Sequence, residues 1–405
     1  MKLIDSIVAE APALAAVRRD LHAHPELCFE EKRTSDLVAA RLQEWGIEVH
    51  RGLGRTGVVG LIRGSGSGAA KRMLGLRADF DALPITELNR FAHASTIPGR
   101  MHACGHDGHT AMLLGAAQHL AGNRGFDGTV CLVFQPAEEG GGGARVMIED
   151  GLFRRFPVEA MFGMHNWPGL PVGQFALRGG PAFASNNEFR IEILGRGAHA
   201  AMPHNGIDPV PIACQMVQAF QTILTRNAHP LDSGVISVTM IQGGEAHNVI
   251  PDRCVLQGTV RAFSMPLIDL IEKRMRMIAE STCAAFEASC RFDFHRGYPP
   301  TVNHEAETGF AREVLAGLVG EANVREFQPT MGAEDFSYFL QAKPGCYFVI
   351  GNGDGVHRDV DHGSGPCMLH NPSYDFNDAL LPLGATLWVR LVEAWFARGA
   401  SATLR

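Results

Sequence analysis

The feature of the sequence that most limits its fold is a change in hydrophobic pattern near residue 183. Before this point, apolar runs typical of strands alternate with helical patterns, which indicates an α/β domain with a mainly parallel sheet. The chain then reads as strand, helix, strand, strand, helix, strand, the ferredoxin-like βαββαβ order of an α+β domain. We therefore predict an inserted second domain at residues 183–296 and a discontinuous first domain formed by residues 1–182 and 297–405.

The individual elements follow from the same patterns and from residues that end helices or form turns. In the first domain we predict helices at 12–23, 30–45, 110–121, 143–150, 305–317 and 380–400, and strands at 58–63, 73–78, 129–134, 160–163 and 347–351. In the inserted domain we predict strands at 187–194, 234–241, 253–263 and 289–295, and helices at 208–225 and 266–288. The Gly/Ser sequence at 64–68 lacks the Lys-Ser/Thr pair of a phosphate-binding loop, so we expect a hairpin turn there.

Composition argues against several classes of function. The chain has 405 residues and a net charge of -7 without a basic run, which argues against a nucleic-acid partner. No run of about 18 apolar residues is present, so we expect no membrane span. The apolar N-terminal stretch is interrupted by Asp5 and Glu10, which indicates an amphipathic helix instead of a signal peptide. Nine cysteines without a framework pattern predict a reduced, cytoplasmic setting.

Potential metal ligands are concentrated in the segment 101–109, MHACGHDGH. It holds Cys104 and His106 in what we expect to be a loop ahead of an apolar helix. Two further histidines lie elsewhere in the chain. His165 follows the strand predicted at 160–163, and His370 precedes the last predicted helix. Thiolate and imidazole donors that arrive separately at strand ends suit a divalent cation. A single histidine is more often a core or surface residue, so each candidate gains weight only from the others.

Two adjacent carboxylates, Glu138 and Glu139, follow the strand predicted at 129–134. They stand between Pro136 and a run of four glycines, and glycine leaves room for a bulky centre. Side chains of adjacent residues in an extended segment point in opposite directions. One carboxylate can then bind a metal while the other accepts a proton from water, which is the division needed for metal-assisted hydrolysis. The alternative is a solvated acidic face.

A second pair of carboxylates, Asp79 and Asp81, follows the strand predicted at 73–78. The pair could bind a metal or orient a ligand. It could equally cap backbone N–H groups in a turn before Pro84. The spacing alone does not separate these alternatives.

Eight motifs taken together resemble a known family. They are RADFDALP, MHACGHDGHTAMLLGAA, VFQPAEEG, MHNWPGLPVG, GRGAHAAMPH, NVIPD, TMGAEDFS and LHNPSYDFND. Their residues and order resemble the M20 family of metallopeptidases and, more closely, its aminoacylase/hippurate hydrolase branch, which includes the plant indoleacetyl-amino acid hydrolases. The resemblance extends from Arg18 to the C-terminal helix. Phe80 and Ala198 stand where the family often has Met and Gly, and both differences concern packing.

The resemblance implies a site for two divalent metal ions. A thiolate ligand favours zinc, manganese is the other main expectation, and cobalt and nickel tolerate the same donors. The implied metal ligands are Cys104, His106, Glu139, His165 and His370. Glu138 is the implied general base, and Asp79 falls where the wider family has a supporting carboxylate behind the metals.

The inserted domain is implied to be a lid that also forms a homodimer, with a tetramer as the alternative. From this domain, His199 is implied to approach the scissile carbonyl in the partner's site. Asn248 and Arg261 are implied to hold the substrate carboxylate, which the planar guanidinium matches. Without the resemblance, a surface ion pair on a strand is the simpler interpretation of Arg261.

The implied function is hydrolysis of a small N-acyl amino acid, hippurate-like or N-acetylated, to a carboxylic acid and a free amino acid. Alternatives on the same fold are a dipeptidase, a carboxypeptidase and an N-acetyl-diaminopimelate deacetylase. An alternative of another class is a non-catalytic binder of acylated amino acids, which would have no use for a general base. By their neighbourhood, the residues expected in the acyl pocket are Asn166, Trp167, Met331 and Phe336.

Overall fold

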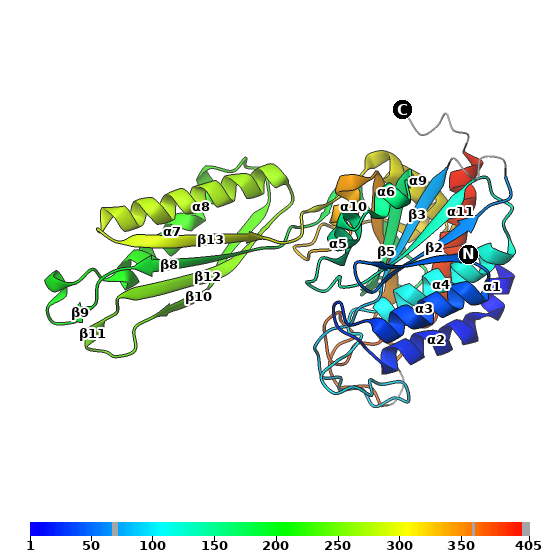
Figure 1. The fold of residues 1–405 in the computed structure, drawn as a ribbon, viewed down its shortest axis with the longest axis horizontal. Helices are drawn as coiled ribbons and strands as arrows, with labels where there is room; N and C mark the ends of the chain where they lie inside the picture. Colours follow the sequence, from blue (N-terminus) through cyan, green and yellow to red (C-terminus); the bar gives the residue numbers. More distant parts are fainter. Residues whose placement is uncertain (67–71, 359–360, 399–405) are drawn as a thin grey trace. The chain divides into compact units, whose positions relative to one another are not determined.

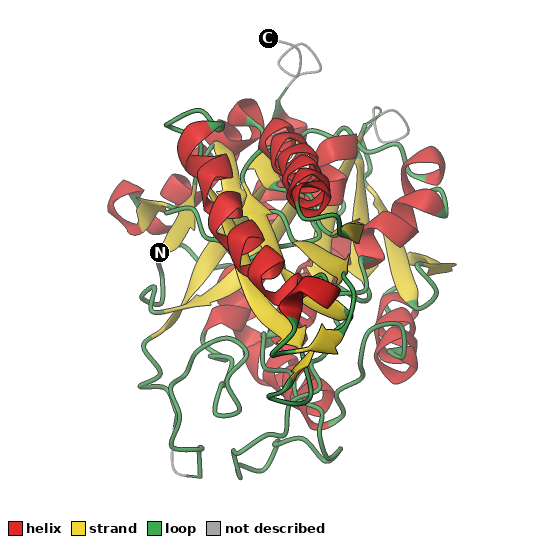
Figure 2. Cartoon of the chain, turned by 90° about the vertical axis from the view of Figure 1, so that its left-hand side faces the viewer, coloured by secondary structure: helices red, strands yellow, loops and turns green. Residues whose placement is uncertain are grey.

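The computed structural model describes residues 1–66, 72–358 and 361–398. Helices and strands are interspersed along these residues (Figure 2). Contacts divide the chain into two compact units, which we call the first and the second unit. The first comprises Met1–Gly180, Asn303–Gln328 and Tyr338–Arg405, and the second comprises Pro181–Val302 and Pro329–Ser337. The division by contacts thus adds 329–337 to the second unit, and the domain limits at 183–296 stay a prediction.

The first unit is built on a sheet with the strand order β1-β2-β4-β3-β5-β16-β6-β15 (Figure 1). The neighbours β4, β3, β5 and β16 are parallel to one another, whereas antiparallel pairs join β1 to β2, β2 to β4 and β16 to β6. The predicted α/β class with a mainly parallel sheet is confirmed. The strands are β1 (Glu48–Leu53), β2 (Gly57–Arg63), β3 (Met73–Asp79), β4 (Thr129–Gln135), β5 (Ala160–Pro168), β6 (Phe175–Leu177), β15 (Val324–Glu326) and β16 (Gly345–Gly353).

The hairpin predicted at 64–68 is wrong, because β2 and β3 are not neighbours. β4 lies between them, antiparallel to β2 and parallel to β3. Both β2 and β3 are almost completely buried, and continuous apolar runs carry no signal for which strand lies beside which. Residues 67 and 68 of the predicted turn lie outside the described residues.

The helices of the first unit cover its sheet, and two of them form the centre of the core. α4 is buried along nearly its whole length and packs against α11. By length and composition α11 is apolar enough to cross a membrane, but 72% of it is buried. The helices are α1 (Asp5–Ala9), α2 (Ala11–Ala23), α3 (Lys32–Glu44), α4 (His106–Gly122), α5 (Gly143–Glu149), α6 (Leu152–Arg155), α9 (Glu305–Val319), α10 (Ser337–Ala342) and α11 (Leu380–Ala397).

Two element boundaries differ from the prediction in a way that matters for the site. α4 begins at His106, four residues before the predicted start, because Gly105 takes a left-handed conformation (φ 87°) that only glycine adopts without strain. His106 therefore lies on a helix and not in a loop. β5 continues through His165, which pairs with Val349 of β16, instead of ending at residue 163.

The second unit has a four-stranded sheet in the order β10-β12-β8-β13, with every neighbour antiparallel. α7 and α8 lie on one face of this sheet and form its apolar core with it (Figure 1). This is the predicted ferredoxin-like βαββαβ arrangement. Its elements are β8 (Asn187–Leu194), α7 (Pro209–Arg226), β10 (Gly234–Gly243), β12 (Arg253–Ala262), α8 (Met265–Ala285) and β13 (Ser289–Arg296), with the short ribbon β9 (Ala198–His199) and β11 (Val249–Ile250).

A buried ion network joins α2 to the start of α4 in the first unit. The imidazole of His22 lies between two carboxylates, with Nδ1 2.9 Å from Asp107 Oδ2 and Nε2 3.2 Å from Glu87 Oε1. Arg18 Nη1 lies 3.6 Å from the same Asp107 oxygen. Burial alone would lower the pKa of His22, but Asp107 and Glu87 raise it to about 9. His22 is therefore a buried cation at neutral pH.

We expect His22→Gln to destabilise the protein in a pH-dependent way. The protonated imidazole stabilises the fold fully below its unfolded pKa of about 6.5, and this contribution is lost as the pH rises through about 9. The loss of unfolding free energy should be about 3 kcal/mol at pH 6 and clearly smaller at pH 10. Urea unfolding of both proteins in chelator measures it. An equal loss at both pH values would contradict a protonated His22.

Candidate metal centre

The first unit brings all five predicted ligands into overlapping groups. Cys104 lies two residues before α4, His106 begins this helix, Glu139 follows β4, His165 lies on β5, and His370 lies in the loop before α11. Donor atoms lie within 4.8 Å of one another in the group Cys104, His106 and His165, and again in the group Cys104, Glu139 and His370. Cys104 belongs to both groups. No other side chain is needed to link them.

The donor atoms of the predicted ligands lie close to one another, and two of them have no hydrogen-bond partner. Glu139 Oε1 lies 3.2 Å from His370 Nε2 and 4.0 Å from His106 Nε2, yet Glu139 Oε1 and His106 Nε2 are buried without a hydrogen-bond partner. Cys104 Sγ lies 3.3 Å from His165 Nε2. Buried polar atoms without partners are costly and rare. A divalent cation would satisfy them, so the residues present fit a metal site.

The pKa shifts of Cys104 and His165 are also consistent with a site that binds a cation. Burial raises the pKa of the Cys104 thiol well above its ordinary value, and the carboxylates of Glu139 and Glu138 add to this effect. Burial lowers the pKa of His165 well below its ordinary value, which keeps the imidazole neutral and able to bind a metal. A thiolate beside two carboxylates is stable only with positive charge nearby.

The two buried histidines are oriented by acceptors on their far side. His106 Nδ1 lies 2.9 Å from the carbonyl oxygen of Asp81 and 3.2 Å from its Oδ1. His165 Nδ1 lies 2.6 Å from the carbonyl oxygen of Asn166. A carbonyl oxygen only accepts, so Nδ1 carries a proton in both rings, and Nε2 is the ring nitrogen that remains to bind a metal. Asp79, Asp81 and Glu139 raise the pKa of His106 to about 10, so a metal ion would have to displace a proton from this ring.

Asp81 organises the site through three contacts. Besides His106, its carboxylate accepts hydrogen bonds from the backbone N–H of Glu139 (2.9 Å) and from the thiol of Cys28 (3.2 Å). The structure thus favours ligand orientation over the turn-capping alternative for this residue. The spacing of the two carboxylates left the role of Asp81 open, and only the family resemblance implied a supporting role for Asp79.

Asp79 is fully buried behind the ligands. It accepts hydrogen bonds from Arg77 Nη1 (2.7 Å) and His109 Nδ1 (2.6 Å), and its Oδ2 lies 3.6 Å from His106 Nε2. Burial alone would raise the pKa of Asp79, but Arg77 and the two histidines hold it well below the ordinary value. Both nitrogens of His109 are engaged, because Nε2 accepts the N–H of Asn166 at 2.9 Å. The supporting role of Asp79 stays a prediction.

Glu138 and Glu139 lie in a turn and not in the extended segment that we expected. Ala137 before them has a left-handed φ of 54°, and Gly140 after them has a φ of 96°. An oxygen of each carboxylate therefore reaches the same nitrogen of His106 within 4.8 Å, instead of pointing in opposite directions. Glu138 is only 7% exposed. The turn presents both carboxylates to one site.

Asn166 supports the ligand loop and is too buried to line an acyl pocket. Its side chain is 0% exposed, donates to the carbonyl oxygen of Cys104 (2.6 Å) and accepts from the hydroxyl of Tyr374 (2.7 Å). Its expected pocket role is therefore wrong. Phe336 is also fully buried, whereas pocket roles for Trp167 and Met331 stay predictions.

In the second unit, His199 and Asn248 lie side by side on the β9–β11 ribbon. His199 pairs with Val249, and the N–H of Ala200 donates to the carbonyl oxygen of Asn248 at 3.0 Å. His199 Nδ1 accepts the N–H of Ala201 at 3.0 Å. The proton of the neutral ring is then on Nε2, which is free to donate. Both side chains are exposed.

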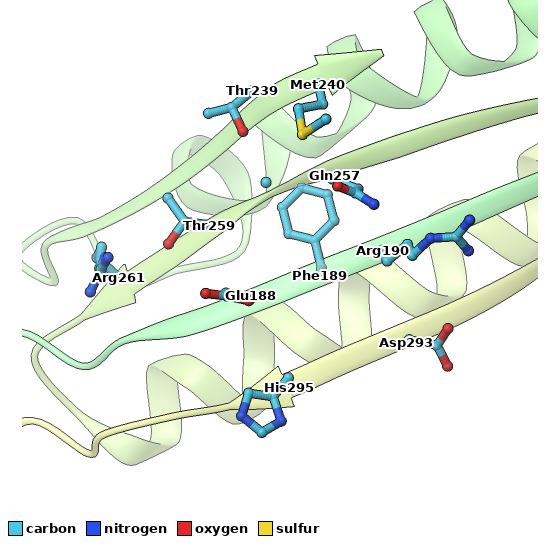
Figure 3. Close-up of a pocket in the computed structure, with 11 residues that line it drawn as sticks. Glu188, Phe189, Arg190, Thr239, Met240, Gln257, Thr259, Arg261, Asp293 and His295 are labelled. Atoms are coloured by element: carbon cyan, nitrogen blue, oxygen red, sulfur yellow. The ribbon is translucent and has the colours of Figure 1, made fainter. Parts of the chain in front are cut away.

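Arg261 lies on β12, in a pocket of about 460 Å³ on the sheet (Figure 3). Thr259 and Glu188 line the same pocket from β12 and the neighbouring β8. Burial lowers the pKa of Arg261, and Glu188 opposes this effect. No carboxylate of the described residues forms an ion pair with this guanidinium within 4 Å. It is a half-buried cation available to an anion.

Arg261 and the pair His199–Asn248 lie at opposite ends of one sheet. β9 and β11 adjoin the start of β12, where the N–H of Gly195 donates to the carbonyl oxygen of Asp252 (Figure 1), whereas Arg261 lies near the end of β12. The eight residue steps along this strand span about 26 Å. Within one chain, Asn248 and Arg261 are therefore not brought together, and they cannot hold the same carboxylate.

The chain is similar in sequence to known proteins of one family. The sequence model of peptidase family M20/M25/M40 matches residues 75–394. The chain belongs to this family. Hippurate hydrolase of Campylobacter jejuni is 38% identical over 96% of this M20 chain and 98% of its own length. IAA-amino acid hydrolase ILR1-like 4 of Arabidopsis thaliana is 39% identical over 96% of the chain and 87% of its own length.

A solved structure of the same family has the same fold. The YXEP protein of Bacillus subtilis, described as a dinuclear metal-binding peptidase from the M20 family, has a TM-score of 0.81 and 33% sequence identity, and the match covers 96% of this chain and 99% of that chain. The predicted M20 membership is confirmed. The prediction that the chain is a hydrolase of amide bonds is confirmed with it.

We expect Gly105→Ala to weaken metal binding by this M20 chain. Gly105 has a left-handed φ, and a Cβ atom there would lie 2.3 Å from Asn166 Nδ2 and 2.4 Å from Tyr374 Oη. Both groups support the Cys104 loop, and loss of such support commonly lowers metal affinity about 10- to 100-fold. Calorimetric titration with Zn²⁺ or Mn²⁺ measures the change.

Gly122→Ala is the matched control for this prediction. Gly122 ends the same helix, and no heavy atom lies within 4 Å of a Cβ added there. Its metal affinity should equal that of the wild type. Unchanged affinity in Gly105→Ala would show that the Cys104 loop does not depend on this close packing.

Proposed function

We propose that the protein is a metal-dependent amidohydrolase that cleaves N-acyl amino acids to a carboxylic acid and a free amino acid. One observation carries the proposal: His106 Nε2 and Glu139 Oε1 are buried without hydrogen-bond partners in a group that also contains Glu138. This combination offers a metal site and, in Glu138, a carboxylate that is not one of the five predicted ligands. The names of two relatives, hippurate hydrolase and IAA-amino acid hydrolase, indicate substrates of the acylated amino acid class.

Two divalent cations would be held by Cys104, His106, Glu139, His165 and His370. Cys104 is common to both donor groups. Zinc suits this thiolate best, and manganese suits the imidazole and carboxylate donors. When bound, the ions would polarise the amide carbonyl and lower the pKa of the attacking water.

Glu138 is the proposed general base. It accepts a proton from the attacking water and returns it to the leaving amine, so that the nitrogen departs as a neutral amino group. His199 would donate from Nε2 to the oxygen that becomes negative in the transition state. Arg261 would bind the carboxylate of the amino acid, because its planar fork matches that group and no carboxylate of the described residues lies within ion-pair distance of it.

We also propose that the active form is a homodimer. One small substrate cannot contact both ends of a sheet about 26 Å long. His199 and Asn248 would therefore act in the partner's site, while Arg261 acts on the substrate of its own chain. We keep the cytoplasm as the proposed location, which is consistent with nine free cysteines.

Glu138→Gln should abolish turnover while the protein still binds metal. The amide keeps the shape of the carboxylate but accepts no proton, so kcat should fall by about 100-fold or more. The assay uses chelator-stripped protein on N-acetyl, N-benzoyl and indoleacetyl amino acids and on dipeptides, with and without Mn²⁺ or Zn²⁺. Metal-dependent release of amino acid by the wild type is expected, and full activity of Glu138→Gln would remove the residue from this role.

The same panel separates the alternatives. Preference for dipeptides over acylated amino acids would indicate a peptidase. Binding of acylated amino acids to metal-loaded wild type without any turnover would indicate a carrier.

Mixed dimers should recover activity from two inactive variants. We expect a dimer of one His199→Ala chain and one Glu138→Gln chain to have one site with both residues intact and one site with neither. Such a dimer, purified through two different tags, should show roughly half of the wild-type activity. If His199 acted within its own chain, every site of the mixed dimer would carry a defect and the activity would stay at the level of the parent variants.

A further inference from the structure

A buried carboxylate outside the ligand set, Glu31, holds the chain next to the proposed general base. Glu31 Oε1 accepts hydrogen bonds from the backbone N–H groups of Phe29 (2.8 Å) and Ala137 (2.9 Å). Glu31 Oε2 accepts from the hydroxyl of Thr56 (2.6 Å). Ala137 directly precedes Glu138, so one of these bonds fixes the peptide from which the Glu138 side chain departs.

The burial of Glu31 is costly, and hydrogen bonds from these donors offset part of the cost. The side chain is 0% exposed, and no Lys, Arg or His side chain forms an ion pair with it among the described residues. Burial raises the pKa of Glu31 to about 7, although the hydrogen bond from Thr56 lowers it. A buried carboxylate without a cation depends on its hydrogen bonds for stability.

Ala137 requires such a bond because its backbone is strained. Its φ of 54° lies in the left-handed region, which is sterically unfavourable for a residue other than glycine. Strain of this kind persists only where the surrounding contacts fix the conformation. Here Glu31 holds the N–H of Ala137, and its carbonyl oxygen accepts from the N–H of Gly143 at 3.1 Å.

Two carboxylates therefore hold the backbone on either side of Glu138. Glu31 binds the N–H of residue 137, and Asp81 binds the N–H of residue 139. Asp81 also contacts His106, so a change there would alter the metal site directly. Glu31 contacts none of the five ligands in the bonds described above, and it is the cleaner probe of the turn.

We propose that Glu31 is a positioning residue that sets the direction of the Glu138 carboxylate for proton transfer. This inference rests on the proposed function, in which Glu138 is the general base. Glu31 does not touch substrate or metal. It acts through the strained peptide at Ala137, and its loss should slow the proton transfer without emptying the metal site.

Glu31→Leu tests the proposal by removing both acceptor oxygens. We expect kcat to fall about 10- to 100-fold, the range that a small misplacement of a catalytic group produces. KM and metal content should change less than about 2-fold, because the ligands and the second unit are not affected. Glu31→Gln keeps one oxygen for both N–H groups and should retain kcat within about 3-fold.

Thr56→Val is the matched control. It removes the hydroxyl from the same carboxylate but leaves the bond to Ala137, so kcat should stay within about 3-fold of the wild type. If Glu31→Leu does not fold, Glu31→Asp decides the matter. This shorter side chain keeps the charge but withdraws the acceptor from Ala137, and a fall in kcat of at least about 5-fold at constant KM and metal content is expected.

Three results would overturn the proposal: an unchanged kcat in the deciding variant, a loss of metal that parallels the loss of kcat, or a Thr56→Val defect as large as that of Glu31→Leu. These are distinct from failure of the proposed function itself, which would appear as a metal-loaded wild type inactive on the whole panel. That result would also remove the role assigned to Glu31.

Discussion

The parallel strands β3, β4 and β5 end at the same edge of the first sheet, and the whole candidate site depends on this. Asp79 ends β3, the Glu138–Glu139 turn follows β4, and His165 lies in the last part of β5. Parallel neighbours necessarily deliver their carboxyl ends to one edge, where open α/β sheets place their ligands. Residues far apart in the sequence meet there because of strand direction.

The donors remain a metal site only because a layer of hydrogen bonds fixes them from behind. Asp81 orients His106, the carbonyl of Asn166 orients His165, and Asn166 holds the loop of Cys104. These supports are as buried as the ligands themselves. The positions of the metal donors at the edge of the sheet thus depend on hydrogen bonds between buried polar groups behind them.

The sequence predicted the fold class, the order of elements in both units and the five donors that the structure groups together. The prediction succeeded where the residue types in a motif are typical of one function, as Cys104 and His106 are of metal binding. It failed where the outcome depends on partners distant in sequence. The placement of β4 between β2 and β3, the hydrogen bond between Asp81 and His106, and the contact of Glu31 with Ala137 have no local signal. The left-handed Gly105 could have indicated the early start of α4, since Gly105 directly precedes it.

The antiparallel sheet of the second unit has a mechanical consequence. His199 and Asn248 adjoin one end of β12, and Arg261 lies near the other end. The length of the strand therefore sets the distance between these groups. Removing two residues from β12 would keep every side chain on its original face but shorten the distance between these groups by about 7 Å. In the proposed dimer, the number of residues in this strand therefore determines whether these groups can serve the two sites.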